Sequence, residues 1–469
     1  MKKEMLRIHN LNCKYSSPVK LADVSICLMT GETAGILGLI NSGKNMLIDI
    51  LCGKQEEFQG IFYLEGKRVA NMEDIHKHVY KISASNYLID SWTVAEYIYL
   101  LSEPSFFGIY QRKKLVSKAN SLFKQLELDV DADKKLKHLT EFEKRLADLA
   151  KAYSLETKIL IIEDDFEGCS AQEIMRFKDT LNRVINGRMT AIVNSYSEQV
   201  LKILSDKYVI FKNGYIVKKC EKDYIRDKAH MEKFLLGTKI TTMKKDLESY
   251  KNEYYSTRDI MYSVRNMVLK KGNFQFDFYK GEVVFIIDLD AKEKKHIFDM
   301  FSGRYIDKTL DIYLEQRLCN FNDITDFVRN KIVSVANLGN RDELMLQMSA
   351  GDNLLLPSLH KIPSLRYFLN QSRITSFLEN EVKKDIIHIR HPVQDMSTSD
   401  CFVLLLERWY IYKPKVLILF EPFMHCDIFG ISLVKSYIRK FTGFGTTVII
   451  LKSSPEYTED ISDRIIYME

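Results

Sequence analysis

The stretch GILGLINSGKN (residues 35–45) lies between an apolar run and a segment with helical periodicity, Met46 to Leu51. It matches the phosphate-loop pattern G-x-x-x-x-G-K-[ST] at three defining positions, but Asn45 stands where the pattern has Ser or Thr. In such a loop, backbone N–H groups at a helix N-terminus bind phosphate oxygens, and glycine lets the backbone come close to them. The stretch therefore predicts a strand, a loop and a helix in that order. The predicted nucleotide-binding residues in it are Gly38, Asn41, Ser42, Gly43, Lys44 and Asn45.

Asn45 decides what chemistry this loop supports. The hydroxyl that it replaces is normally a ligand of Mg²⁺, and a carboxamide oxygen is a poorer substitute for it. The loop is therefore expected to hold a nucleotide and to be poorly equipped to hydrolyse it. The alternative interpretation is a relic turn that packs the helix on the strand and binds nothing.

Length and composition limit the function classes. The chain has 469 residues, 46% hydrophobic and 28% charged, which suits a globular protein with at least two domains. A formal charge of +5 is too small to indicate nucleic-acid binding, and none is expected. No apolar run is long enough to span a bilayer, and the first residues lack the apolar core of a signal peptide. The eight cysteines include no C-x-x-C pair, which favours reduced thiols in a cytoplasm.

An internal repeat indicates a duplicated domain. Gly31-Glu32 recurs as Gly281-Glu282, and Gly53 recurs as Gly303, in each case 250 residues later. Further along, the apolar run 159–162 recurs at 416–419, and 190–193 recurs at 447–450, in each case 257 residues later. Two constant offsets separated by a small insertion are poorly explained by chance.

Each half predicts the same α/β architecture. Short apolar runs divided by helical patterns indicate a mostly parallel sheet core, preceded by an antiparallel β region and interrupted by a helical insert. The expected segments are domain 1 at 1–240, domain 2 at 241–469, helical inserts around 97–155 and 360–412, and a polar linker around 213–256.

Several strings carry a resemblance to a known family. They are Gly38–Asn45, Leu149–Ala152, Lys158–Ile162, Met348–Asn353 with Leu354–Leu359 directly after, Arg408-Trp409, Pro414–Leu419 with Glu421-Pro422 after it, Asp427, and Ser462–Ile465. Over nearly its whole length the chain resembles the tandem ATP-binding subunit of bacterial ABC importers of the ribose, galactose and xylose type. The resemblance implies two tandem P-loop NTPase (ABC ATPase) domains.

The resemblance also implies roles for single residues in the first half. Tyr15 corresponds to an aromatic residue that stacks on adenine; a plain surface tyrosine is the alternative. Glu163 and Asp164 take the places of the family's magnesium-holding Asp and catalytic Glu, so Asn45 and Glu163 are the candidate metal ligands and Asp164 a candidate catalytic residue. A solvated strand end is the alternative interpretation of both acids. No histidine stands at Ser195 or Tyr196, where the family's switch histidine is expected.

Departures from the family pattern are greater in the second half. The phosphate-loop position, residues 288–295, has no glycine and gains three acids, and Phe420 replaces the magnesium-holding Asp. Glu421 remains as a candidate catalytic residue, with a structural role as the alternative. The second-half counterpart of the family's L-S-G-G-Q signature, Met396 to Asp400, keeps Ser397 but loses both glycines. The family geometry would place Ser397 against the phosphates held by Lys44. We therefore expect ATP and Mg²⁺ at one site per chain at most.

Two functions follow from these expectations. In the first, the chain is the ATP-binding subunit of a sugar-type ABC importer and couples ATP binding to solute import through membrane permease subunits, with weak or no hydrolysis. It would then be cytoplasmic and peripheral on the inner face of the cell membrane, with a solute-binding protein as an indirect partner. In the alternative, it is a catalytically inactive pseudo-ATPase with a regulatory or scaffolding role.

Overall fold

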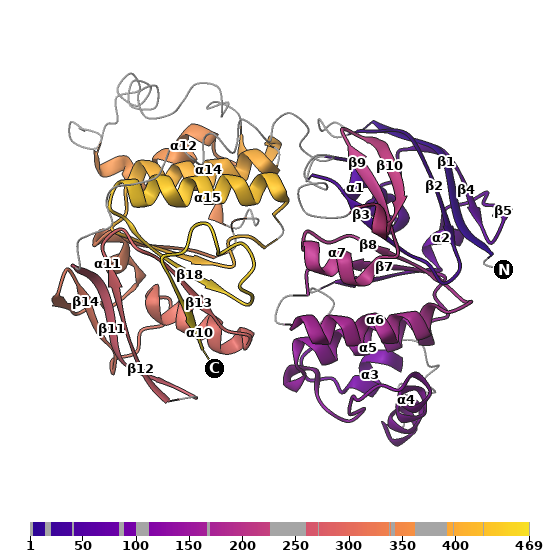
Figure 1. Ribbon diagram of the computed structural model, residues 1–469, viewed down its shortest axis with the longest axis horizontal. Helices are drawn as coiled ribbons and strands as arrows, with labels where there is room; N and C mark the ends of the chain where they lie inside the picture. The colour runs from indigo at the N-terminus through magenta and orange to yellow at the C-terminus, as the bar shows by residue number, and fades with distance from the viewer. Residues whose placement is uncertain are drawn as a thin grey trace. The chain divides into compact units, whose positions relative to one another are not determined.

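The computed structural model describes residues 3–14, 20–39, 42–83, 89–99, 112–166, 169–225, 259–270, 272–336, 338, 343–361, 392–396, 398–424 and 426–468. The chain divides into two compact units, Met1–Gly237 and Thr238–Glu469, whose described elements are labelled in Figure 1. Each unit has an antiparallel sheet, a mostly parallel sheet and helices, which confirms the predicted fold class.

Unit 1 contains a four-stranded antiparallel sheet in the order β2-β1-β4-β5 and a six-stranded sheet in the order β10-β9-β3-β8-β7-β6. The larger sheet is parallel except for its β9–β10 pair. Its strands and those of the smaller sheet are β1 (Glu4–Lys14), β2 (Lys20–Met29), β3 (Thr33–Leu37), β4 (Gln59–Leu64), β5 (Lys67–Arg68), β6 (Val79–Ser83), β7 (Ile159–Glu163), β8 (Thr190–Val193), β9 (Lys207–Lys212) and β10 (Tyr215–Glu221). The helices are α1 (Lys44–Leu51), α2 (Glu73–His76), α3 (Val94–Tyr99), α4 (Arg112–Leu126), α5 (Glu141–Ser154), α6 (Ala171–Ile185) and α7 (Glu198–Leu204), with the 3-10 turns η1 (Leu136–His138) and η2 (Lys222–Tyr224).

Unit 2 repeats this plan with an antiparallel sheet β12-β11-β14-β15 and a parallel sheet β16-β17-β18-β13-β19. The strands are β11 (Ile260–Leu269), β12 (Gly272–Tyr279), β13 (Val283–Ile287), β14 (Asp311–Leu314), β15 (Arg317–Cys319), β16 (Ile332–Ala336), β17 (Val416–Phe420), β18 (Thr447–Lys452) and β19 (Arg464–Tyr467). The helices are α10 (Ala291–Phe301), α11 (Ile324–Arg329), α12 (Ala350–Leu355), α14 (Thr398–Tyr412) and α15 (Ile428–Gly443), with η4 (Leu356–Lys361) and η5 (Val393–Asp395).

The alternation of β13 shows how the unit 2 core is built. Val283, Phe285 and Ile287 pack into a cluster with residues of α12, α14 and α15. Val284 and Ile286 face the other way, into a cluster with α10, β11 and β12. A strand covered on both faces has to be apolar at every position, which is why this stretch reads as a continuous apolar run. Figure 1 shows α14 and α15 along one face of the sheet and α10 on the other.

The backbone repeats along with the sequence. Gly31 and Gly281 have φ angles of 71° and 73°, and Gly53 and Gly303 have 74° and 72°. A side chain rarely adopts these left-handed conformations, so glycine recurs where the two units turn alike. The strands predicted at 159–162, 190–193, 416–419 and 447–450 are confirmed as β7, β8, β17 and β18.

The predicted polar linker is wrong for residues 213–225. Residues 215–221 form β10, which pairs antiparallel with β9 through a turn at Asn213 and Gly214, both with positive φ. Asn-Gly is the strongest short signal for a hairpin turn, but β10 is an edge strand in which no residue is fully buried, so it lacks the buried apolar run of a central strand. Residues 226–258, the rest of the expected linker, lie outside the described residues.

The helical inserts are confirmed where they are described. In unit 1, α3 begins at Val94 and packs against α4 and α5. In unit 2, residues 362–391 of the expected insert lie outside the described residues. Among the helices that the structure does describe, none combines the length and the apolar character required to cross a bilayer.

Candidate functional site

The loop of unit 1 connects the end of β3 to the start of α1. At Gly38 an added Cβ would lie 2.3 Å from Ser42 Oγ and 3.1 Å from the backbone oxygen of Phe211, so only glycine fits there. Gly43 has a φ of 96°, a second position that favours glycine. The Ser42 carbonyl accepts a hydrogen bond of 2.8 Å from the Gly214 amide, which ties the loop to the β9–β10 turn. The two pattern glycines therefore have a steric reason in this fold.

The start of α1 has no capping side chain from its own N-cap residue. The N-cap is Gly43, which carries no side chain, and the first turn holds no acid. Lys44 is 1% exposed, and its Nζ lies 3.8 Å from the centre of the Tyr196 ring. An uncapped helix N-terminus with an adjacent ammonium group is a suitable environment for a phosphate.

Tyr196 is one of the two positions, with Ser195, at which the switch histidine was expected, and Asp165 fixes both residues by hydrogen bonds. Asp165 Oδ1 accepts from Ser195 Oγ at 2.5 Å and from the Tyr196 amide at 2.7 Å. The Tyr196 hydroxyl accepts from Asn45 Nδ2 at 3.1 Å. Tyr196 therefore contacts both Lys44 and Asn45 within unit 1.

The predicted metal ligands Asn45 and Glu163 come together where α1 begins and β7 ends. Asn194 Nδ2, just after β8, donates to Asn45 Oδ1 at 3.0 Å and to Glu163 Oε1 at 3.1 Å. Lys81 on β6 donates to Glu163 Oε2 at 2.6 Å. Burial is the largest single influence on the pKa of Lys81 and lowers it, but the hydrogen bond to Glu163, the charge of Glu163 and smaller contributions together raise it more, so the net shift is upward. These oxygens do not fit a resident Mg²⁺, because a metal ion would have to displace an ammonium and an amide group.

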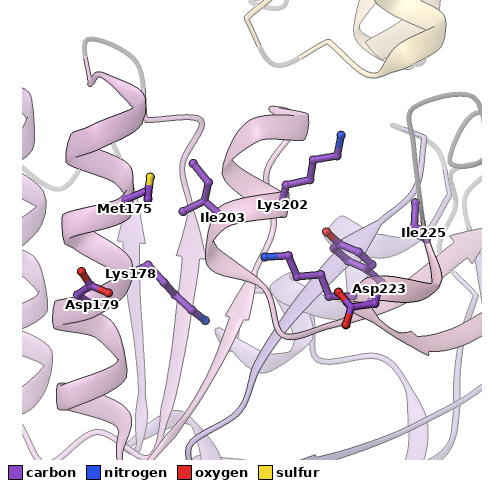
Figure 2. Close-up of a pocket in the computed structure, with 9 residues that line it drawn as sticks. Met175, Lys178, Asp179, Lys202, Ile203, Asp223 and Ile225 are labelled. Atoms are coloured by element: carbon purple, nitrogen blue, oxygen red, sulfur yellow. The ribbon is translucent and has the colours of Figure 1, made fainter.

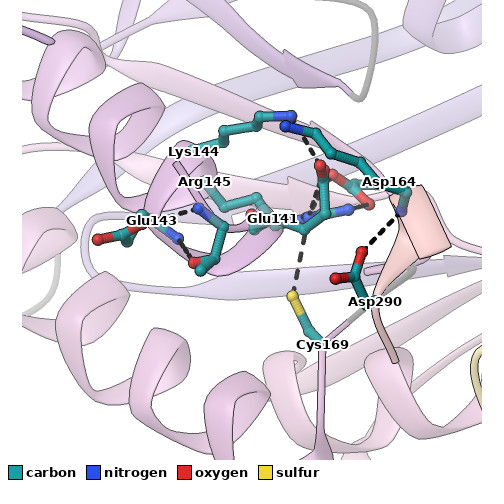
Figure 3. A network of polar contacts seen from close by, with 9 residues as sticks. Glu141, Glu143, Lys144, Arg145, Asp164, Cys169 and Asp290 are labelled. Carbon is teal, nitrogen blue, oxygen red and sulfur yellow. Dashed lines mark hydrogen bonds and ion pairs between the residues drawn. The ribbon is translucent and has the colours of Figure 1, made fainter. Parts of the chain in front are cut away.

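Asp164, the candidate catalytic residue, lies in a polar network with Arg145 (Figure 3). Its two oxygens accept from Arg145 Nε at 2.8 Å and Arg145 Nη2 at 2.9 Å, and both side chains are buried. Burial lowers the pKa of Arg145, yet the charge of Asp164 raises it overall. A buried bidentate ion pair of this kind leaves Asp164 no free lone pair directed at the phosphate loop.

The resemblance places the family's L-S-G-G-Q signature of the first half at Leu139–Glu143, and these residues lie at the start of the self-capped helix α5. Thr140 Oγ1 accepts from the Glu143 amide at 3.1 Å, and Glu143 Oε2 accepts from the Thr140 amide at 2.7 Å. This capping box satisfies amides at the start of α5 that an anion would otherwise use. Glu141 pairs with Lys144 at 2.7 Å (Figure 3).

In unit 2 the phosphate-loop position has become part of a helix. α10 begins at Ala291, whereas α1 begins at Lys44, whose counterpart by the offset is Lys294. Asp290 caps α10, and its Oδ1 accepts from the amides of Lys292 at 2.9 Å and Glu293 at 3.1 Å. The amides that would hold a phosphate therefore already bind a carboxylate of the chain itself.

The lysine of this second loop is also engaged internally. Lys294 is fully buried and donates to Glu421 Oε1 at 2.5 Å and to Ser453 Oγ. Glu421 Oε1 also accepts from the Ser453 amide at 2.6 Å. Glu421, a candidate catalytic residue, therefore lies in a buried ion pair with the residue that corresponds to Lys44.

Two of the family strings of unit 2 contact one another. Arg408 Nε donates to the Asn353 carbonyl at 2.8 Å, and Arg408 Nη2 donates to Asn353 Oδ1 at 2.6 Å. Asn353 in turn brackets Met345, accepting from its amide and donating to its carbonyl, both at 2.9 Å. These residues hold α12 to α14, so this part of the scaffold is intact.

Three predicted nucleotide-binding residues, Tyr15, Asn41 and Ser397, lie outside the described residues. The structure brings together Gly38, Ser42, Gly43, Lys44 and Asn45, with Glu163 beside them. Sequence reasoning missed Lys81 and Asn194 as members of this site. The carboxyl ends of parallel strands meet at one edge of a sheet, so residues at the ends of β6, β7 and β8 were the available signal.

A separate hollow of about 650 Å³ lies in unit 1 beside α6, α7 and η2 (Figure 2). Its lining includes Lys178, Lys202 and Lys222 together with two aspartates. Lys178 pairs with Asp206 at 2.7 Å and Lys202 with Glu198 at 2.7 Å. Because these charges are balanced locally, the hollow offers no concentrated field for a phosphate, unlike the start of α1.

A strand, a glycine-bearing loop and a helix, set in a mostly parallel sheet beside an antiparallel sheet, resemble a P-loop NTPase domain of the ABC ATPase type. The family model described as ABC transporter matches residues 21–166. Over its whole length the chain resembles the tandem ATP-binding subunit of bacterial sugar-type ABC importers, as the sequence strings predicted.

Curated relatives carry this resemblance. The ribose import ATP-binding protein RbsA of Caldanaerobacter subterraneus is 24% identical, covering 99% of this chain and 94% of the relative. The xylose import ATP-binding protein XylG of Histophilus somni is 23% identical, with the same two coverages. Among solved structures, the ADP conformation of MJ1267, an ATP-binding cassette of an ABC transporter, matches with a TM-score of 0.42 and 18% identity, over 51% of this chain and 97% of that one.

Proposed function

We propose that this chain is the nucleotide-binding subunit of a sugar-type ABC importer and binds one ATP per chain, at the loop of unit 1. The observation that carries the proposal is the contrast between the two loops. The N-cap of α1 is Gly43, which has no capping side chain, whereas the α10 amides are capped by Asp290. Backbone amides bind an external anion only where the chain does not supply its own.

The proposal includes a permease partner and a place at the inner face of the membrane. Support comes from the relatives named as ribose and xylose import ATP-binding proteins, which match over nearly the whole chain. The Arg408–Asn353 contact supports continued assembly, because the string that contains Asn353 is retained and packed. Co-expression with a permease of the sugar-importer type and co-purification from membranes tests this part.

The proposal also holds that hydrolysis is weak or absent. Asp164 is bound by Arg145, Glu163 by Lys81 and Asn194, and Glu421 by Lys294. None of these carboxylates is left to orient a water molecule, and Tyr196 lacks the imidazole of a switch histidine. A steady-state ATP turnover of about 1–10 per second, which is ordinary for enzymes, would contradict this part of the proposal.

The second candidate is a pseudo-ATPase with a regulatory or scaffolding role. The specific observation in its favour is that the candidate metal-binding and catalytic acids of both units, Glu163, Asp164 and Glu421, serve as partners in internal ion pairs. Titration of ATP into the protein with and without a permease separates the two candidates. If nucleotide binding changes the association with the permease, the transport subunit is favoured. If the association is the same with and without nucleotide, the scaffold is favoured.

A further inference from the structure

We infer that the unit 1 site binds ATP without a divalent cation, because Lys81 and Asn194 take the place of the metal ion. The inference rests on the proposed nucleotide binding at this loop. It concerns the counter-charge that this chain provides where related sites use Mg²⁺.

The first argument is the engagement of the oxygens. Mg²⁺ binds through oxygen atoms in near-octahedral geometry and gives up its waters reluctantly. Here Asn194 Nδ2 lies between Asn45 Oδ1 and Glu163 Oε1 and donates to both. Because both neighbours are acceptors, the amide group of Asn194 is fixed with its nitrogen toward them. The nitrogen therefore occupies the point on which the ligand oxygens converge.

The second argument is charge. Lys81 Nζ lies 2.6 Å from Glu163 Oε2, which is a short charge-assisted hydrogen bond. Asp49 lies within electrostatic reach of Glu163, Lys81 and Lys54, and Lys54 also acts on Lys81. Two carboxylates and two ammonium groups thus balance one another before any ion is added. A divalent cation at Glu163 would meet the Lys81 ammonium at close range, where like charges repel strongly.

The third argument is that the residues at the metal-ligand positions differ from the family pattern in the same way in both units. The pattern hydroxyl at position 45 has become an amide that donates to the Tyr196 hydroxyl at 3.1 Å. In unit 2 the corresponding residues are Lys295 and Phe420, which are not metal ligands at all. The same position has therefore lost metal-binding character in both units. In unit 1 alone it keeps a helix N-terminus that can receive phosphate.

The experiment measures binding of a fluorescent ATP analogue, mant-ATP, to the full chain in Mg²⁺ and in excess EDTA. The inference predicts dissociation constants that agree within about twofold between the two conditions. For Lys81→Met it predicts that Mg²⁺ tightens binding by about tenfold or more, because Glu163 is then unpaired. The double variant Lys81→Met/Glu163→Gln should lose that response. Lys158→Met is the matched control, since Lys158 pairs with Glu65 at the opposite end of β7.

A second measurement titrates Mn²⁺ into the nucleotide-free protein and follows free Mn²⁺ by electron paramagnetic resonance. Wild type should bind no Mn²⁺ through Glu163, and Lys81→Met should gain a site that Glu163→Gln removes. Wild-type nucleotide binding that requires Mg²⁺ would overturn the inference and leave the proposed function standing. If wild type binds no nucleotide in either condition, the proposed binding fails, and the Mn²⁺ titration decides the inference alone: a wild-type Mn²⁺ site abolished by Glu163→Gln overturns it.

Discussion

The loops at the start of α1 and α10 descend from one repeat and have reached opposite states. In unit 1 the helix starts at Lys44 after a left-handed Gly43, which has no side chain to cap it, and the first turn holds no acid. In unit 2 the helix starts earlier, at Ala291, and the Asp290 carboxylate accepts from its amides. The Lys44 ammonium group lies over the Tyr196 ring, whereas the Lys294 ammonium group donates hydrogen bonds to Glu421 and Ser453. An anion site can therefore be lost when a carboxylate of the chain itself takes the place of the bound anion, while the fold around the site is kept.

The largest expected effect concerns the ion pair that closes the second loop. Glu421→Ala leaves the Lys294 ammonium buried without its carboxylate, and unit 2 should lose about 3–5 kcal/mol of unfolding free energy. The double variant Lys294→Met/Glu421→Leu should recover most of this loss. Urea unfolding followed by fluorescence in a Trp92→Phe background reports on unit 2, because Trp409 is then the only tryptophan. A double variant as unstable as Glu421→Ala would contradict the explanation.

A comparable loss is expected in unit 1 when Asp164 is truncated. Asp164→Ala leaves the buried Arg145 guanidinium unpaired, at a cost of about 3–5 kcal/mol. In a Trp409→Phe background, Trp92 fluorescence during urea unfolding measures it. Asp164→Asn, which keeps the volume, should leave mant-ATP affinity unchanged. Loss of ATP turnover in Asp164→Asn without loss of stability would show that Asp164 acts in catalysis after all.

A smaller effect is expected where Lys44 rests on an aromatic ring. Tyr196→Leu removes the ring from a buried ammonium group and should cost about 1–2 kcal/mol of unit 1 stability. Tyr196→Phe keeps the ring and loses only the hydrogen bond from Asn45. The same tryptophan measurement compares the two variants. Equal losses in both would mean that the hydroxyl, not the ring, holds the lysine.

The smallest effect is expected at the cap of α10. Asp290→Ala removes the acceptor of two helix amides and should cost unit 2 about 1 kcal/mol. Thr140→Ala is the matched variant in unit 1, since Thr140 caps α5 in the same way. If Asp290→Ala instead creates a second nucleotide site, measured as additional bound mant-ATP, then the cap alone separates the two loops. Unchanged stability with no new site would show that the cap matters little.

The sequence predicted the features that depend on local pattern. Gly38 and Gly43 mark the first loop, and the constant offsets revealed the duplication and the buried strands. The hairpin strand β10 was missed because an edge strand buries few side chains, although Asn213-Gly214 indicated its turn. The capping box Thr140–Glu143 was also readable from its spacing.

Partners that are distant in sequence could not be predicted. Lys81 meets Glu163 only because β6 and β7 pair in parallel, with Ser83 opposite Glu163. Lys294 and Glu421 are 127 residues apart, and their pairing needs the whole parallel sheet. The loss of an anion site was visible from the acids at 288–295, but the internal ligands that replaced the anion appear only in three dimensions.

The central claim is that one loop of the two receives nucleotide, and the most direct test is the number of ATP molecules bound per chain by equilibrium dialysis. The account predicts one in wild type, none in Lys44→Ala, and one in Lys294→Met/Glu421→Leu. Two molecules per wild-type chain, or binding that survives Lys44→Ala, would contradict it.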